Sequence, residues 1–268
     1  MEPYSLHDVS VIIPVRIDHA DRLDTLHAVL KYFDKFFIDA EILVIETGPT
    51  QQCTHLSSPG TIEYEYIYDE GPFPKSRLVN HGARKASRDI VAVNNADVVV
   101  RPEAIHAMVC LFREHPDTGY GLPHNGVLLD VNGRAKRRLL AKWDFSLIPH
   151  VADAELHRRY GDAVVCLNPA APGGASYFRK DVFLELGGFN ERFLACVWAD
   201  AELGVRFTKM GYPPAVIKDA NALHLHHARV SDRDSGLYQA RNRLEYERVC
   251  RMSRQELEEY IRAELRIG

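Results

Sequence analysis

Asp97 lies at a position where an unpaired carboxylate would be costly. It ends the stretch Asn95-Ala96-Asp97, which separates two β-branched runs, residues 90–93 and 98–100. A carboxylate held between buried strands loses its hydration, so it must be paired or bound to a cation. A divalent cation that also touches phosphate groups would explain an oxygen ligand here. The alternative is a turn aspartate in a β-hairpin.

The histidines near residue 225 are a second candidate for metal chemistry. Three of the 13 histidines occur between His224 and His227, soon after the apolar run 215–217. One turn or a bent strand end can direct the side chains of His224 and His227 at a common point. Imidazole is a common ligand for Mn-like and Zn-like ions. A solvated histidine cluster without a metal is the alternative. The zinc-hydrolase pattern H-E-x-x-H is absent, which argues against a hydrolase.

A third candidate lies in the stretch from Trp198 to Leu203, at the start of a predicted helix. Its acidic residues, Asp200 and Glu202, have two possible roles. They could complement the positive end of the helix dipole. One of them could instead be a general base for an acceptor hydroxyl. The sequence alone leaves both readings open.

The elements that must position these side chains follow from the spacing of apolar residues. Short β-branched runs predict strands, and apolar residues recurring every three or four positions predict helices. In the first 100 residues the two patterns alternate as in a doubly wound α/β layer. The predicted strands are residues 9–15, 41–45, 62–68 and 90–93, with helices around 23–33 and 72–87.

Polar side chains lie at or just after the ends of these strands or before the following helix. They are Arg16, Glu46, Lys75 and Asp97. Open α/β sheets bind ligands at the carboxyl ends of their strands. The phosphate-binding patterns G-x-x-x-x-G-K-[ST] and G-x-G-x-x-G are absent, so a nucleotide would be held by another device. For any one of these residues, a turn-forming role is the alternative.

The second half of the chain has a weaker pattern. Residues 169–176 combine two prolines, two glycines and small side chains, which predicts a loop whose backbone a ligand could approach closely. Between residues 120 and 160 the clearest feature is a basic patch, Arg134–Arg138. The predicted helices are residues 104–114, 181–186 and 200–210, followed by a polar, amphipathic helical tail.

Composition narrows the class of protein. The 268 residues, 46% hydrophobic and 26% charged, suit one large globular domain. The net charge of −4 gives no basic excess for nucleic-acid binding. The sequence has no apolar run of about 18 residues, no evident signal peptide and five dispersed cysteines, as expected in a reducing compartment. We expect no integral membrane segment and a cytoplasmic location, or a peripheral one at the inner membrane face, where the basic patch could contact lipid.

Taken in order, these motifs resemble those of GT-A-fold nucleotide-sugar glycosyltransferases of family 2, including β-1,4-galactosyltransferase and chondroitin polymerase domains. The resemblance covers about residues 9–229. His224 and His227 align with the two late metal ligands of those relatives. The other matching segments are 12–16 (I-I-P-[FV]-R), 73–82 (F-N-R-[AS]-[KR]-L-[LV]-N-x-G), 95–97 (D-x-D), 172–176 with 187–191 (F-G-G-V-S…N-G-F-N-E) and 199–203 (E-D-D-[DE]-[LIF]).

The resemblance implies an α/β, Rossmann-like mixed sheet with helices on both faces and a C-terminal helical tail. We expect a single domain over residues 1–268, with a nucleotide-binding half (1–100), an acceptor and metal half (101–230) and the tail (231–268). The implied activity is that of a metal-dependent, inverting, galactosyltransferase-like hexosyltransferase of polysaccharide biosynthesis. It would move a sugar from a UDP-sugar donor to a hydroxyl of a saccharide or lipid-linked saccharide acceptor.

Carried over residue by residue, the resemblance also implies roles for individual side chains. Asp200 is the expected catalytic base, and the expected ligands of Mn²⁺ or Mg²⁺ are Asp97, His224 and His227. Trp198 and Glu202 are expected to contact the acceptor. The expected donor contacts are Pro14, Arg16, Glu46, Lys75, Asn95 and Gly174.

Three departures from the family pattern leave an alternative open. Asn95 replaces the first acid of D-x-D, Ala199 replaces the first acid of E-D-D, and residues 193–198 replace the glycine-rich W-G-W-G-G. Loss of two carboxylates is also compatible with a non-catalytic module that binds a nucleotide sugar or a partner. A nucleotidyltransferase is less compatible, because the loop of residues 16–19 contains no glycine.

Overall fold

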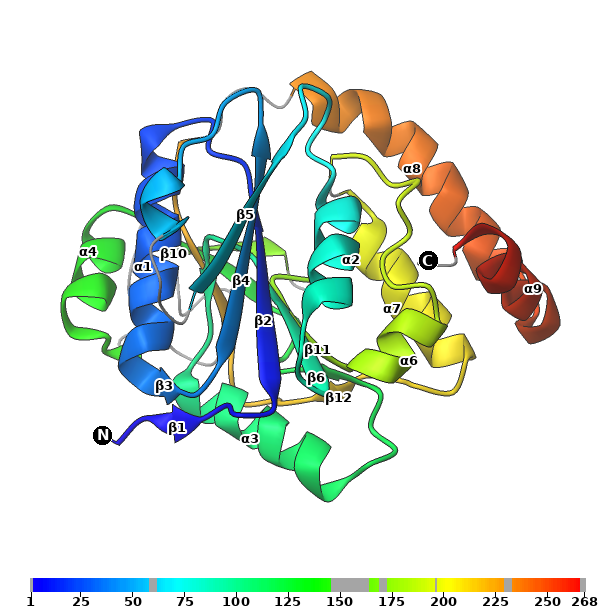
Figure 1. Ribbon diagram of the computed structural model, residues 1–268, viewed down its shortest axis with the longest axis horizontal. Coiled ribbons are helices and arrows are strands. Elements are labelled where there is room, and N and C mark those ends of the chain that lie inside the picture. The colour runs from blue at the N-terminus through cyan, green and yellow to red at the C-terminus, as the bar shows by residue number, and fades with distance from the viewer. Residues whose placement is uncertain are drawn as a thin grey trace.

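The computed structural model describes residues 2–57, 62–145, 164–168, 173–195, 197–228 and 233–265. A central sheet runs through the molecule, with α1 to one side of the strands and α2, α6 and α7 to the other (Figure 1). Among these residues, no helix has both the length and the apolar character that a membrane crossing needs. The arrangement confirms the predicted α/β class with helices on both faces.

Four parallel strands from the first half of the chain form one side of the main sheet. Their order is β5-β4-β2-β6, so the chain starts near the middle of the sheet and winds outward in both directions. All four were predicted from the sequence, three from short apolar runs and β5 from its alternation of apolar and polar residues. Their bounds are Val9–Val15 (β2), Glu41–Gly48 (β4), Ile62–Tyr68 (β5) and Ile90–Asn94 (β6).

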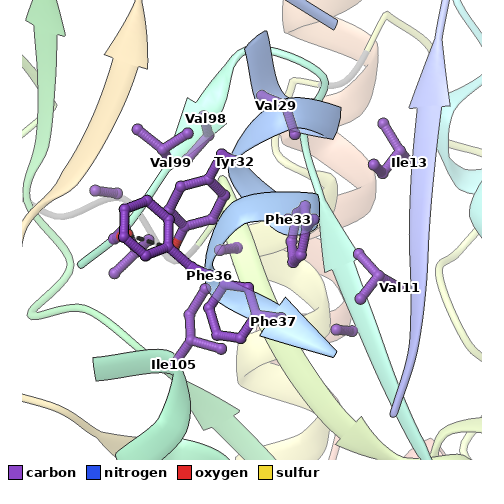
Figure 2. Packing of buried hydrophobic residues seen from close by; sticks show 14 of the residues in the cluster. Val11, Ile13, Val29, Tyr32, Phe33, Phe36, Phe37, Val98, Val99 and Ile105 are labelled. Atoms are coloured by element: carbon purple, nitrogen blue, oxygen red, sulfur yellow. Dashed lines mark hydrogen bonds between the residues drawn. The ribbon is translucent and has the colours of Figure 1, made fainter. Parts of the chain in front are cut away.

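Side chains alternate between the two faces of this sheet. From β2, Val11 and Ile13 enter the cluster that packs under α1 (Ala20–Phe36), whereas Ile12 enters the cluster on the opposite face. Figure 2 shows Val11 and Ile13 facing Val29 and Phe33 of α1. Burial on both faces explains why β2, β4 and β6 have largely continuous apolar sequences, whereas β5, at the edge of the sheet, alternates between apolar and polar residues.

Helix α2 (Lys75–Lys85) packs very closely on the other face. A Cβ atom on its Gly82 would lie 2.7 Å from Cγ2 of Ile12, so this approach requires glycine. The helix begins with Lys75 at the edge where the parallel strands end, because α2 follows β5 through a short loop. This packing fixes the position of the lysine.

Strands from the second half complete the main sheet and form a smaller one. The main sheet gains β11 (Ala175–Arg179), antiparallel to β6, then β8 (Tyr120–Leu122) and β12 (Ala215–Val216). The second sheet has the order β10-β9-β13-β7. Its strands are Val164–Asn168 (β10), Leu128–Val131 (β9), Ala222–Leu225 (β13) and Val98–Val99 (β7).

Between β6 and β7 the chain passes from the main sheet to the second sheet. Because these strands belong to different sheets, Asp97 lies in a crossing between sheets, and the hairpin alternative for this residue is wrong. The strands β8 and β9 lie in the region where the sequence pattern was weak. So does α4 (Gly133–Lys142), which contains the basic patch.

The remaining helices follow the predictions closely. Residues 169–172, the first half of the predicted small-residue loop, lie outside the described part of the chain. The tail consists of two helices, and α8 packs on α7. The helix bounds are Pro102–Glu114 (α3), Lys180–Glu185 (α6), Ala199–Lys209 (α7), Arg233–Arg251 (α8) and Arg254–Glu264 (α9); the short elements are Tyr4–Ser5 (β1), Phe37–Ile38 (β3) and the 3-10 turn Thr54–Ser57.

Candidate functional site

Asp97, His224 and His227 meet in one buried cluster, called here the Asp-His-His cluster. Strand β13 pairs antiparallel with β7, and this register sets His224 opposite Val98, the residue after Asp97. The Nε2 atom of His227 lies 3.1 Å from Oδ2 of Asp97, and that of His224 lies 3.6 Å from the same oxygen. The structure therefore brings together three residues that are up to 130 positions apart in the sequence.

The donor set of this cluster fits a divalent cation. One ligand atom from each residue lies within 4.8 Å of the others. Ligand bonds of about 2.1 Å at right angles would put donor atoms about 3 Å apart, close to the 3.1 Å and 3.6 Å between Oδ2 of Asp97 and the two histidine nitrogens. Among the described residues, Oδ1 of Asp97 is buried without a hydrogen-bond partner, so an acceptor oxygen is left for a cation. A mixed set of one carboxylate and two imidazoles suits Mn²⁺ better than Ca²⁺.

Asp130 supports the cluster from the next strand. Strands β9 and β13 are parallel, and Asp130 lies beside His224 in register. Its two oxygens contact Nδ1 of His224 at 2.6 Å and Nδ1 of His226 at 2.7 Å. A second carboxylate on the outer nitrogen fixes the imidazole so that Nε2 faces the metal position. Asp130 is not among the residues predicted from the sequence, although a carboxylate in the apolar run 128–131 is the same signal that selected Asp97.

The charges in the cluster shift the ionisation of its members. Burial alone would lower the pKa of His224, but Asp130 and Asp97 outweigh it and raise this pKa to about 9. Burial would likewise raise the pKa of Asp97, but hydrogen bonds from His224 and His227, with the nearby charge of Arg22, hold it well below its usual value. The carboxylate is thus ionised at neutral pH, as a metal ligand must be, whereas His224 must lose its proton when a cation binds.

Lys75 and Asp200 form an ion pair at the start of two helices. Lys75 is the first residue of α2, and its Nζ lies 2.9 Å and 3.0 Å from the two carboxylate oxygens of Asp200, the second residue of α7. Lys75 is buried, and its ammonium also lies over the ring of Phe189. A predicted donor contact and the predicted base are therefore direct neighbours, which the sequence did not indicate.

Gly173 forms another wall around Asp200. A Cβ atom at this position would lie 2.7 Å from both Cγ and Oδ2 of Asp200. The small residue therefore leaves room for the carboxylate itself, rather than only for a ligand. The next residue, Gly174, has φ +100° and accepts a hydrogen bond from the backbone of Asn95, so two predicted donor contacts are adjacent.

The structure does not support the prediction that Glu202 contacts an acceptor. Its side chain is fully buried, and its two oxygens accept hydrogen bonds of 2.7 Å and 2.9 Å from Arg206. Arg206 also donates to the backbone oxygens of Leu186 and Gly188. Glu202 therefore neutralises a buried arginine that ties α7 to the turn after α6.

The other predicted donor contacts lie along the edge of the sheet, and two of them bind nearby loops. Arg16 donates to the backbone oxygens of Gly71 and Asp69, and Pro14 is buried within β2. Glu46 is fully buried, and backbone N–H groups of the loop after β4 bind both of its oxygens. This bonding makes Glu46 an anchor of that loop, and its contact with a donor stays a prediction.

The segment before Asp200 is held by the C-terminal tail. Ala195 and Trp198 have φ of +55° and +70°, which is costly for residues with side chains. Asn242 of α8 is buried and donates to the backbone oxygens of Leu194 (2.7 Å) and Val197 (2.9 Å). The tail thus sets the shape of the segment that carries Trp198, whose ring packs on Tyr246.

The sequence model described as glycosyl transferase family 2 matches residues 10–186, more than half of the chain. The chain belongs to this family. It is 25% identical over 262 residues to the uncharacterized protein y4gI of Sinorhizobium fredii, covering 91% of this chain and 27% of that protein. It is 26% identical over 253 residues to the O-antigen biosynthesis protein RfbC of Myxococcus xanthus, covering 89% of this chain and 19% of that protein. The family 2 chain therefore spans about a quarter or less of these longer relatives.

The fold agrees with this assignment. The mannosyltransferase PcManGT of Pyrobaculum calidifontis, solved in complex with GDP-Man and Mn²⁺, superposes with a TM-score of 0.53 at 14% identity, covering 96% of this chain and 70% of that one. Likeness at this identity establishes the fold alone. The family 2 chain has the GT-A fold that the motifs predicted.

Proposed function

We propose that this family 2 domain transfers a sugar from a nucleotide-sugar donor to a hydroxyl of a saccharide acceptor, with inversion at the anomeric carbon. The observation that carries the proposal is the buried Asp-His-His cluster, which combines the right donor atoms, their spacing and an unpartnered acceptor oxygen. A cation bound there would neutralise the charge on the departing diphosphate. We further propose a UDP-sugar as donor, with galactosyl transfer the first activity to test.

Asp200 is the proposed general base. Its carboxylate would take the proton of the acceptor hydroxyl as that oxygen attacks the anomeric carbon. The bond from this carbon to the diphosphate oxygen breaks, and the nucleoside diphosphate leaves with the electron pair. Lys75 orients the base through contacts with both of its oxygens, and Gly173 leaves the space in which the carboxylate lies.

Of the two residues predicted to contact the acceptor, Trp198 keeps this role in the proposal and Glu202 does not. Trp198 offers a ring and a buried indole N–H that has no hydrogen-bond partner among the described residues, which suits a sugar hydroxyl. Glu202 is excluded from this role by its pairing with Arg206. The name of RfbC favours a bacterial surface polysaccharide as the acceptor.

Hydrolysis of donors in the absence of acceptor tests the proposal directly. The full chain is incubated with UDP-galactose, other UDP-hexoses and GDP-mannose, with Mn²⁺ or with chelator, and released nucleotide is measured. We expect release from one donor class that depends on metal. Asp97→Ala should abolish the metal dependence, whereas Asp34→Asn, at an exposed position on α1, should leave it unchanged.

The non-catalytic alternative makes a different prediction in the same assay. A module that only binds a nucleotide sugar would be stabilised by donor and metal in thermal unfolding, but it would release no nucleotide. Asp200→Asn then separates the steps. A catalytic base should affect turnover by about 10²–10⁴-fold while donor binding survives.

A further inference from the structure

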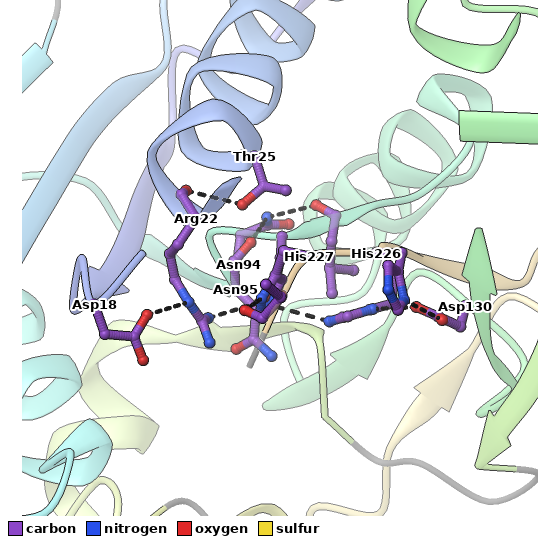
Figure 3. Close-up of polar contacts among 12 residues, drawn as sticks. Asp18, Arg22, Thr25, Asn94, Asn95, Asp130, His226 and His227 are labelled. Carbon is purple, nitrogen blue, oxygen red and sulfur yellow. Dashed lines mark hydrogen bonds and ion pairs between the residues drawn. The ribbon is translucent and has the colours of Figure 1, made fainter. Parts of the chain in front are cut away.

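Arg22 contacts the same carboxylate oxygen as the two histidines of the Asp-His-His cluster. It lies in the first turn of α1, and its Nη1 donates to Oδ2 of Asp97 at 3.0 Å. Its Nε lies 3.5 Å from Asp18 on the other side. Figure 3 shows Arg22 reaching down from α1 between Asp18, at the left, and His227. Sequence analysis did not select this residue.

A fixed positive charge lies beside the carboxylate of the proposed metal site. Asp97 is the one acidic member of the Asp-His-His cluster, since Asn95 replaces the first acid of D-x-D. A guanidinium keeps its charge at any pH that a folded protein tolerates. A divalent cation approaching Asp97 therefore meets a fixed positive charge that already shares its ligand, and the two repel each other.

Arg22 can also bind a second kind of partner. Its side chain is a quarter exposed, and its planar fork of N–H donors matches the oxygens of a phosphate. The diphosphate of a donor would complete the shell of a cation that has one negative ligand from the protein. It would therefore lie next to both the cation and Arg22.

We propose that Arg22 competes with the divalent cation for Asp97 in the free protein and moves to the diphosphate when the donor nucleotide binds. The competition makes metal binding weak without nucleotide. Transfer of the guanidinium to the diphosphate removes the competition, so nucleotide and metal strengthen each other's binding. By linkage, each must enhance the affinity of the other by the same factor. This inference rests on the proposed metal site and adds a residue that couples it to the donor.

The direct test measures Mn²⁺ affinity of the full chain without nucleotide, from the electron paramagnetic resonance signal of free Mn²⁺. Arg22→Gln removes the charge and keeps polar atoms, whereas Arg22→Lys keeps the charge. We expect Arg22→Gln to bind Mn²⁺ about tenfold more tightly or better, within the usual 5- to 150-fold range of such couplings. Arg22→Lys should stay near the wild type. Arg113→Gln, which breaks an ion pair with Asp8 outside the cluster, should match the wild type.

A second measurement follows the guanidinium to the nucleotide. Calorimetry with chelator present compares UDP and GDP with uridine and guanosine. Arg22→Gln should weaken binding of the diphosphates about tenfold and leave the nucleosides unaffected, because a contact between guanidinium and phosphate is lost. The mutual enhancement of Mn²⁺ and diphosphate should shrink in the same variant.

The outcomes separate this inference from the proposed function. If Asp97→Ala binds Mn²⁺ as well as the wild type, the metal site itself is wrong. If Asp97→Ala loses Mn²⁺ but Arg22→Gln binds it no more tightly than the wild type, the site stands and the competition by Arg22 is refuted. Unchanged diphosphate affinity in Arg22→Gln would refute the transfer of the guanidinium. A lower melting temperature with unchanged Mn²⁺ affinity would identify Arg22 as a structural ion pair.

Discussion

Gly173→Ala should disable the proposed base without disturbing the fold. The new Cβ would lie 2.7 Å from Cγ and Oδ2 of Asp200, which is 0.7 Å shorter than the 3.4 Å at which ordinary contacts begin. The carboxylate must move by roughly this distance, and Lys75, held under it by burial, cannot follow freely. Misplacement of a reacting group by about 1 Å can cost about 10²-fold in rate. We therefore expect kcat to fall about 100-fold.

The fold should survive, because Asp200 is a partly exposed side chain that can rotate, but the melting temperature should fall because the ion pair with buried Lys75 weakens. Gly173 also lacks the positive φ that would make alanine strained. Gly204→Ala provides the matched control on the same helix as Asp200. Its Cβ would meet only the hydroxyl oxygen of Tyr120, at 3.9 Å, so the rate should be unchanged and α7 should gain up to about 1 kcal/mol.

The assay compares initial rates of donor hydrolysis or transfer at saturating donor, together with Mn²⁺ affinity and thermal unfolding. Asp200→Asn sets the lower limit of the rate. If Gly173→Ala turns over like the wild type while Asp200→Asn is inactive, the observed position of the carboxylate is not the reactive one. If both variants are active, Asp200 is not the base.

Three further predictions concern the surroundings of the site. Asp130→Ala should weaken Mn²⁺ binding about 10- to 100-fold, because the ring of His224 loses the partner that orients it. Calorimetry without nucleotide measures this affinity, and an unchanged value would contradict the orienting role. Lys75→Ala should lower kcat as well as donor affinity, because the lysine contacts both oxygens of Asp200; an effect confined to KM would identify it as a donor contact alone. Burial lowers the pKa of His124 to about 4, and its Nδ1 accepts a backbone hydrogen bond that only the neutral ring can form. Above pH 6.5 the ring is neutral in both states, and as the pH falls toward 4 the unfolded state takes up the proton, so the contribution of His124 to folding stability decreases. Between pH 7 and pH 5 this contribution should fall by about 2 kcal/mol, measured by urea unfolding as the difference between the wild type and His124→Gln.

The sequence by itself determined the layered plan and the positions of the metal-binding candidates. β-Branched runs between helical periods are local signals, because a strand buried on both faces must be apolar throughout. Asp97 stood out for the same reason, since a charge within such a run needs a partner. These inferences require only near neighbours along the chain, and they succeeded for the parallel strands β2, β4 and β6, while β5 was predicted from its alternating pattern.

Contacts between distant residues were decided by the tertiary structure. Asp130 meets His224 because β9 and β13 pair in a particular register, and β9 lies in a region with weak periodicity. Lys75 meets Asp200 across 125 positions because α2 and α7 both begin beside the same end of the sheet. No local pattern encodes the packing of one helix start against another.

Glu202 shows that the local sequence does not determine whether a polar side chain is buried. An acidic residue in the first turn of a helix is compatible with solvent, with a ligand and with a buried partner. Its pairing with Arg206 at i+4 is a common surface pattern, yet both side chains are fully buried here. Whether that face of α7 meets water or the protein interior depends on the turn after α6, whose backbone oxygens satisfy the remaining donors of Arg206. Burial is a property of the assembled layers, and it turned a predicted acceptor contact into part of the core.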